Sequence, residues 1–153
     1  MRNTNTNKPA VIIIGIDHYL GVQTARIFAH RGVPVIGIAK NSKHFGCRTN
    51  VCEKILYADV LSEELIDTLT ALGPELPQKA VLLPCRDMSV LMVSRHREKL
   101  APYYHFALPE KDTIEMLMDK MRFYDYAQKN NLPVPKFQLL HNRRDAEAAA
   151  KNL

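Results

Sequence analysis

The chain has 153 residues, of which 46% are hydrophobic and 24% are charged, a composition that supports one folded domain and argues against wholesale disorder. Its net charge of +5 favours an anionic ligand such as a nucleotide. The basic residues are scattered, however, and nucleic-acid binding needs a clustered footprint, so we expect no nucleic-acid partner.

The sequence carries no membrane or secretion signal. No apolar run approaches the roughly 20 residues that cross a bilayer, and the polar residues 1–9 lack the apolar core of a signal peptide. We therefore expect a disordered leader over residues 1–9, no membrane partner and a cytoplasmic protein. The three cysteines have no paired spacing and the six histidines form no ligand motif, so we expect neither a disulfide framework nor a metal site.

The next hundred residues alternate between buried-strand and amphipathic-helix patterns. Short apolar runs that do not alternate with polar residues are typical of parallel strands covered on both faces. Such runs predict strands at residues 11–16, 33–39, 54–58, 80–84 and 105–109, with helices between most of them. We predict an α/β fold over residues 10–109: an open, parallel, Rossmann-like sheet of about five strands flanked by helices.

The turn after the first strand is the first candidate site. Ligands of doubly wound folds bind beyond the carboxyl ends of the strands, where Gly15, Asp17, His18 and Gly21 are predicted to lie. Glycines allow close backbone approach, and the next helix offers free amides. The spacing is not GxGxxG, and Lys40 stands where a dinucleotide site has an acidic residue. The alternative is a tight turn that binds no ligand.

Two more polar segments follow strand ends. Arg86 and Asp87 come directly after the fourth strand, on the expected ligand side. This pair either binds a polar substrate, or Asp87 simply caps the next helix. The basic loop 41–50 follows the second strand, and we interpret it as a phosphate contact or a solvated connection.

The segment from 110 to 135 reads as two helices. The apolar phase changes at Asp119, a good N-cap, which predicts helices at 112–118 and 120–130. Pro133 and Pro135 then force extended backbone. A strand at 137–140 and a helix at 143–153, capped by Asn142, are predicted next. One such helix cannot bury its own face, so we expect an unfinished second domain.

Residues 118–135, MDKMRFYDYAQKNNLPVP, resemble the helix pair that ends the pre-ATP-grasp domain of the ATP-grasp superfamily. The likeness is strongest to carboxylate–amine ligases of the D-aspartate ligase type, which also share the Gly15-Ile16-Asp17 and Cys85-Arg86-Asp87 patterns. The resemblance implies a pre-ATP-grasp Rossmann-like domain at 10–109, a helical linker at 110–135 and the start of a truncated ATP-grasp domain at 136–153.

The resemblance also implies a chemistry. In that superfamily ATP phosphorylates a carboxylate, and an amine or other nucleophile attacks the acylphosphate, with Mg²⁺ stabilising the transferred phosphoryl group. Lys120 matches a position that often contacts ATP, whereas the nucleotide clamp and the Mg²⁺ ligands lie further along such enzymes. We therefore expect ATP and Mg²⁺ in the parent protein, no cofactor held firmly here, and an inactive fragment without catalytic residues.

The expected partners are a small carboxylate or amino-acid substrate, the missing ATP-grasp module of the same chain, and a second copy in a homodimer. Gly15, Asp17, His18, Gly21, Arg86 and Asp87 are the candidate substrate-binding residues. Two alternatives stay open: a stand-alone nucleotide- or dinucleotide-binding Rossmann module, or a protein-interaction domain in which Arg86 and Lys120 are only structural.

Overall fold

The structure is a computed structural model that describes residues 8–135, 137–138, 140 and 142–152, so most of the predicted leader lies outside it. The chain divides into two compact units, Met1–Glu115 and Met116–Leu153. The strands are β1 Val11–Ile14, β2 Val35–Ala39, β3 Lys54–Tyr57, β4 Ala80–Pro84 and β5 Tyr104–His105. The helices are α1 Tyr19–His30, α2 Glu63–Leu72, α3 Asp87–Arg95, α4 Arg97–Leu100, α5 Lys111–Met118, α6 Lys120–Lys129 and α7 Arg143–Asn152, with short 3₁₀ turns at Phe45–Arg48 and Gly73–Glu75.

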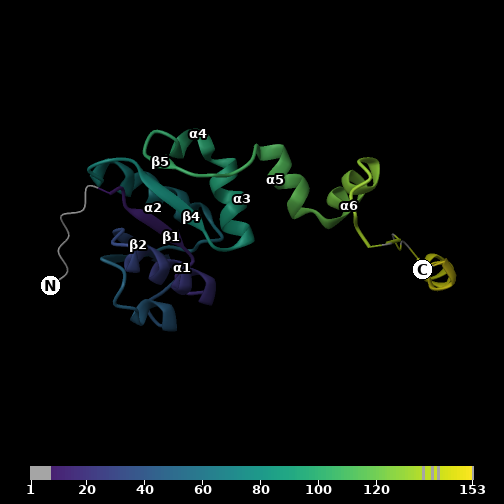
Figure 1. The fold of residues 1–153 in the computed structure, drawn as a ribbon, viewed down its shortest axis with the longest axis horizontal. Coiled ribbons are helices and arrows are strands. Elements are labelled where there is room, and N and C mark those ends of the chain that lie inside the picture. The colour runs from purple at the N-terminus through teal and green to yellow at the C-terminus, as the bar shows by residue number, and fades with distance from the viewer. Residues whose placement is uncertain (1–7, 136, 139, 141, 153) are drawn as a thin grey trace. The chain divides into compact units, whose positions relative to one another are not determined.

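The five strands form one parallel sheet in the order β3-β2-β1-β4-β5 (Figure 1). β1 lies at its centre, with Val11 opposite Val35 of β2 and Val81 of β4. Every residue of β1 is buried, as its unbroken run of β-branched side chains predicts. The predicted open, parallel α/β sheet is confirmed.

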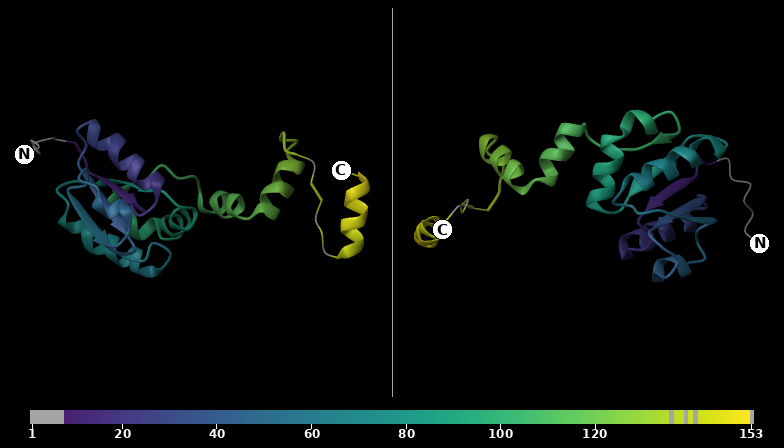
Figure 2. Two further views of the ribbon diagram at one scale, coloured as in Figure 1. Left: turned by 90° about the horizontal axis from the view of Figure 1, so that it is seen from below. Right: turned by 180° about the vertical axis from the view of Figure 1, so that it is seen from behind.

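Each face of the sheet packs against different helices. Ile12 and Ile14 belong to a core cluster with the apolar stripe of α2 and with residues of α3 and α4. Val11 and Ile13 point the other way, because side chains alternate along a strand, and they pack in a cluster with Val22 of α1. The helices on the two sides of the sheet can be followed in Figures 1 and 2.

Four of the five strands differ in their bounds from the sequence prediction, β2 and β3 by one or two residues and β1 and β5 for reasons that the structure shows. β1 stops at Ile14 because Gly15 adopts a φ of +94°, which turns the chain out of the sheet. β5 is Tyr104–His105 and not residues 105–109. The carbonyls of Leu108 and Pro109 accept hydrogen bonds from the Arg97 guanidinium instead of joining the sheet.

The prediction that Asp87 caps the helix after the fourth strand is wrong. Arg86 occupies the N-cap position of α3, and Asp87 is the first helical residue. The buried Ser89 hydroxyl accepts a hydrogen bond from the Arg86 backbone N–H at 3.2 Å and donates to the Arg86 carbonyl at 2.7 Å. The hydroxyl of Ser89 thus provides the local bonding that the sequence analysis assigned to Asp87.

The helix break at Asp119 is confirmed. The Asp119 carboxylate accepts from the backbone N–H groups of Met121 and Arg122, at 2.9 and 3.3 Å, which starts α6 as a separate helix. Asn142 accepts from the Asp145 N–H at 3.1 Å and starts α7, also as predicted.

The predicted strand at 137–140 is wrong for the part that the structure describes. Residues 137, 138 and 140 lie in no strand, and residue 139 lies outside the described residues. Within the second unit the Tyr124 and Phe137 rings pack with their centroids 4.5 Å apart, so Phe137 finds an aromatic partner on α6 and not on a neighbouring strand. None of the described helices is both long and apolar enough to cross a membrane.

Candidate functional site

Polar side chains gather where β1 to β4 end, at the carboxyl edge of the sheet. Because the strands are parallel, the residues that follow them meet at this one edge. Asp17 follows β1, Lys40 follows β2, Asp59 follows β3 and Arg86 follows β4. We call these four residues the edge cluster. The sequence predicted Asp17 and Arg86 as site residues but missed Lys40 and Asp59.

The predicted glycine turn is formed by close backbone packing. A Cβ on Gly21 would lie 2.2 Å from the Gly15 carbonyl oxygen, so α1 can begin against the turn only with glycine at this position. His18 is the N-cap of α1, and its Nδ1 accepts from the Leu20 N–H at 3.4 Å. The turn therefore presents the first amides of α1 at the carboxyl edge, while Gly15 and Gly21 also have a structural role that needs no ligand.

Asp17 is buried beside this turn with half of its carboxylate unsatisfied. Its side chain is only 9% exposed. Oδ2 accepts a long hydrogen bond from the Lys40 backbone N–H at 3.4 Å. Oδ1 is buried and has no hydrogen-bond partner among the described residues. Leaving a buried carboxylate oxygen unpaired is costly, which is the usual mark of a group that binds something else.

Arg86 lies across the same turn and is exposed. Its Cγ and Cδ atoms are 3.4 and 3.5 Å from the point where a Cβ on Gly15 would stand, and Asp17 Oδ1 is 3.8 Å from that point. Within the described part of the chain, no hydrogen bond engages the guanidinium. Arg86 thus places its side-chain stem at the same turn as the unsatisfied oxygen of Asp17, with its guanidinium donors unused.

Lys40 and Asp59, the remaining two residues of the edge cluster, form a salt bridge with each other. Lys40 Nζ lies 2.7 Å from Asp59 Oδ2. The hydrogen bond from Lys40 lowers the pKa of the Asp59 carboxyl, with a second bond from the Leu61 N–H and the charge of Arg86 adding to the effect. Lys40 is therefore committed to Asp59, while Arg86 contributes its charge and keeps its donors available.

The basic loop after β2 covers the turn through Gly46, a residue that the sequence analysis did not predict as part of the site. A Cβ on Gly46 would stand 1.8 Å from the Ile16 carbonyl oxygen, so the loop backbone lies directly on the turn. Cys47 follows, and burial raises the pKa of its thiol, with the negative charge of Asp17 adding to the shift. An isolated glycine in a polar loop was the only sequence signal for this contact.

Asp87 and Lys120, two other predicted site residues, are both exposed. Asp87 is exposed in the first turn of α3. Lys120 is the first helical residue of α6 in the second unit, where it is exposed. No group of three or more His, Cys, Asp or Glu side chains among the described residues is placed to hold a metal ion.

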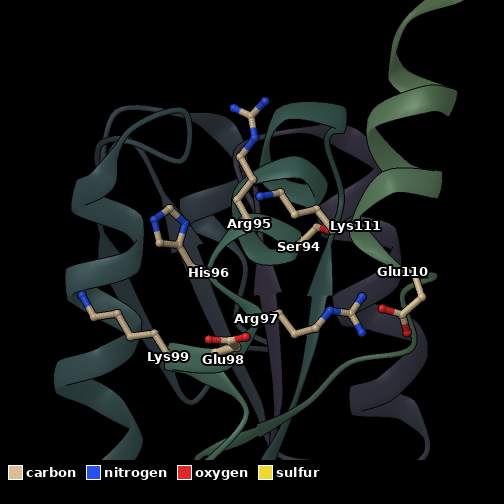
Figure 3. Close-up of a pocket in the computed structure, with 8 residues that line it drawn as sticks. All are labelled: Ser94, Arg95, His96, Arg97, Glu98, Lys99, Glu110 and Lys111. Atoms are coloured by element: carbon tan, nitrogen blue, oxygen red, sulfur yellow. The ribbon is translucent and has the colours of Figure 1, made fainter. Parts of the chain in front are cut away.

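A pocket of about 510 Å³ lies around the last turn of α3 and the start of α5 (Figure 3). Its charged side chains are largely committed within the first unit. Arg95 pairs with Glu115 at 3.1 Å, His96 contacts Glu63 at 3.2 Å, and Lys99 pairs with Asp67 at 3.4 Å. The sequence did not predict this pocket, and its paired charges make it a weaker candidate than the edge cluster. Its lining residues are Ser94, Arg95, His96, Arg97, Glu98, Lys99, Glu110 and Lys111.

Comparison with solved structures identifies the fold. N5-carboxyaminoimidazole synthetase from Staphylococcus aureus, complexed with ADP, matches 95% of this chain with a TM-score of 0.69 and 20% identity. The N5-carboxyaminoimidazole ribonucleotide synthetase from Thermus thermophilus matches 93% with a TM-score of 0.64 and 18% identity. An L-amino acid ligase from Bacillus licheniformis matches 95% with a TM-score of 0.64 and 14% identity. The shared fold is the open, parallel α/β fold described above.

The resemblance predicted from residues 118–135 is thus confirmed at the level of the fold. At these identities the likeness shows the fold and not an activity. This chain spans 36%, 36% and 42% of the three solved chains, respectively, so it corresponds to little more than a third of each. No family model matches the sequence, and no curated protein does.

Proposed function

We propose that this chain is the N-terminal, substrate-side domain of an ATP-dependent carboxylate–amine ligase. The observation that carries the proposal is that Asp17 and Arg86 lie at one turn of the carboxyl edge, each with binding capacity that the described residues leave unused. The shared fold supports it, because two of the similar structures are named synthetases and one an amino acid ligase.

The role of this domain is to bind and orient a small carboxylate or amino-acid substrate. Arg86 and the first amides of α1 suit a carboxylate, because both offer N–H donors and positive potential. A carboxylate oxygen then attacks the γ-phosphorus of ATP and ADP leaves. An amine nitrogen attacks the acyl carbon, phosphate leaves, the amine gives up a proton, and an amide results. Holding the carboxylate in one orientation is the contribution of this chain to the rate.

The ATP-grasp module that performs the transfer would follow in the same chain. Lys120 is the proposed ATP contact of the present segment, with residues 110–135 as the linker and 136–153 as the start of the module. One lysine does not form a nucleotide clamp, so the 153-residue chain is expected to bind ATP weakly and to catalyse no ligation. ATP and Mg²⁺ would be held by the module, in a cytoplasmic protein.

Exposed apolar side chains near the edge cluster support a covering module. Tyr19 and Phe45 are each 61% exposed, and both follow strands that end at this edge. Leu61 and Met88, which follow β3 and β4, are also exposed. Apolar side chains around a polar site mark a surface that another element covers.

The encoding reading frame beyond Leu153 tests the proposal. We expect a continuation with a glycine-rich strand pair and a later Glu…Glu-x-Asn set, and the protein it encodes should release ADP only when carboxylate and amine are both present. A stop codon directly after Leu153, or ADP release independent of the carboxylate, would contradict the ligase proposal.

A stand-alone nucleotide- or dinucleotide-binding module is the second candidate, because the Gly15 turn leads into the N-terminus of a twelve-residue helix. Titration of the chain with NAD and with ATP separates the two. Micromolar affinity for NAD would favour this second function. If the chain is instead an interaction domain or a homodimer building block, substitution of Arg86 and Lys120 should leave the activity of the parent unchanged.

A further inference from the structure

The unsatisfied oxygen of Asp17 limits which ligands the carboxyl edge can take. Oδ1 accepts hydrogen bonds when ionised and donates none. A ligand that presented only phosphate or carboxylate oxygens here would place like charges together and leave Oδ1 unpaired. A ligand that presented an N–H group would satisfy it.

Neither Lys40 nor Cys47 plays that part. The ammonium group of Lys40 is 2.7 Å from Asp59, and only its backbone N–H reaches Asp17, on the other oxygen. Cys47 on the covering loop is close enough for the charge of Asp17 to raise the pKa of its thiol, but its Sγ donates to the Asn41 carbonyl. Lys40 and Cys47 are therefore both committed elsewhere, and Oδ1 has no hydrogen-bond donor among the described residues.

Arg86 lies beside the same turn as Oδ1. The Arg86 stem and Oδ1 lie against the same side of Gly15, at 3.4 and 3.8 Å from the position of a Cβ there. Because Arg86 is exposed and no hydrogen bond within the described chain holds its guanidinium, its N–H donors are available to a ligand carboxylate.

We propose that Asp17 is the specificity-determining residue of this site and selects ligands that carry an ammonium group next to a carboxylate. The ammonium donates to Asp17 Oδ1, and the carboxylate accepts from Arg86 and the first amides of α1. This inference rests on the proposed function, since it takes the carboxyl edge as the substrate site. It adds that the substrate held here is a zwitterionic amino acid and not a simple carboxylic acid.

The test compares three probes on the unmodified ¹⁵N-labelled 153-residue chain: alanine, propionate without the ammonium, and alaninamide without the carboxylate. Binding is followed through the amide signals of the turn at residues 15–21. We expect alanine to bind roughly tenfold more tightly than propionate, the discrimination that one charge-assisted hydrogen bond provides. Equal affinities for alanine and propionate, or no binding of either, would overturn the proposal.

Variants then assign the roles. Asp17→Asn should bring the alanine-to-propionate ratio close to one, and Arg86→Gln should weaken alanine and propionate but not alaninamide. Asp67→Asn removes the same charge from an exposed position on α2 and should leave all three affinities unchanged. A ratio that survives Asp17→Asn would overturn the proposal. If Asp17→Asn does not fold, the probe comparison on the unmodified chain still decides.

The outcomes separate this inference from the proposed function. If propionate binds as tightly as alanine, and the reading frame continues into an ATP-grasp module, the ligase proposal stands and the proposed role of Asp17 is wrong. If alanine binds selectively, and the reading frame stops directly after Leu153, the proposed role of Asp17 stands and the ligase proposal is wrong.

Discussion

Gly21 has no side chain, and this allows α1 to pack directly on the Gly15 turn. An alanine in a helix ordinarily improves on glycine by about 1 kcal/mol. Here the new Cβ would stand 2.2 Å from the Gly15 carbonyl oxygen and 2.8 Å from its carbon, which are backbone atoms that cannot swing away. The steric clash therefore outweighs the gain in helix propensity, and it makes the substitution destabilising.

We expect Gly21→Ala to lower the free energy of unfolding by about 1–3 kcal/mol, the usual cost of overpacking. Urea denaturation followed by circular dichroism measures it. Gln23→Ala, at an exposed position of the same helix, should change stability by less than about 0.5 kcal/mol. A stabilised Gly21→Ala variant would show that α1 does not pack on the turn.

The buried thiol of Cys52 makes the stability of the first unit depend on pH in the alkaline range. Burial raises the pKa of its thiol from 9.0 to about 11, and the neighbouring Cys47 adds to the shift. Because the folded pKa is the higher one, the folded state favours the neutral thiol. This stabilising contribution is fully present below pH 9 and is lost as the pH rises to about 11.

The free energy of unfolding should therefore fall between about pH 9 and 11, and it should fall less in Cys52→Ala. Denaturation curves at about pH 8 and about pH 10.5 give the comparison. Tyr104 also has a pKa raised by burial, but it is present in both proteins and its effect cancels in the difference. Parallel losses of stability in the two proteins would contradict the assignment to Cys52.

At the scale of elements, the start of α6 depends on one carboxylate. Asp119→Ala removes two hydrogen bonds to the first turn, those to Met121 N–H and Arg122 N–H, and should cost about 1 kcal/mol of local helix stability. Hydrogen exchange of the amides of α6 should speed up accordingly. Asp125→Ala is the matched control, because its exposed pair with Lys129 four residues on contributes only about 0.2–0.5 kcal/mol. Equal acceleration in both variants would contradict the capping role.

The elements themselves were largely predictable, because their causes are local. The apolar run of β1 and the caps at Asp119 and Asn142 depend on neighbours in the sequence, and the sequence indicated all three. The fifth strand was misplaced because Arg97, about ten residues earlier, binds the carbonyls of Leu108 and Pro109.

Site contacts were harder to predict, because they join residues from distant parts of the chain. The rule that ligands bind beyond strand ends led to Asp17 and Arg86. It applies equally to Lys40 and Asp59, which were missed because neither stands in a recognisable motif. No local pattern indicates that Gly46 lies on Ile16, or that Asp17 keeps one oxygen unsatisfied, since both facts arise only when the loop folds over the turn.

For the whole molecule, the first unit should fold without the second. It contains the complete sheet and both core clusters, and its last buried side chain is Ile114, which is 3% exposed. A chain ending at Met118 keeps α5 intact, with Ile114 and the Arg95–Glu115 pair. A chain ending at Pro109 loses all three. Burial of an isoleucine contributes about 1.5–3 kcal/mol, and the exposed ion pair contributes about 0–1 kcal/mol.

We therefore expect the chain ending at Met118 to unfold in one cooperative transition, with the stability of the first unit in the full chain. The chain ending at Pro109 should be about 2–3 kcal/mol less stable, because Ile114 no longer fills its place beside the core. Chemical denaturation of both chains measures the difference. Loss of cooperative unfolding on truncation at Met118 would mean that residues after α5 are needed to complete the core. Equal stability of the two shortened chains would mean that α5 contributes nothing to it.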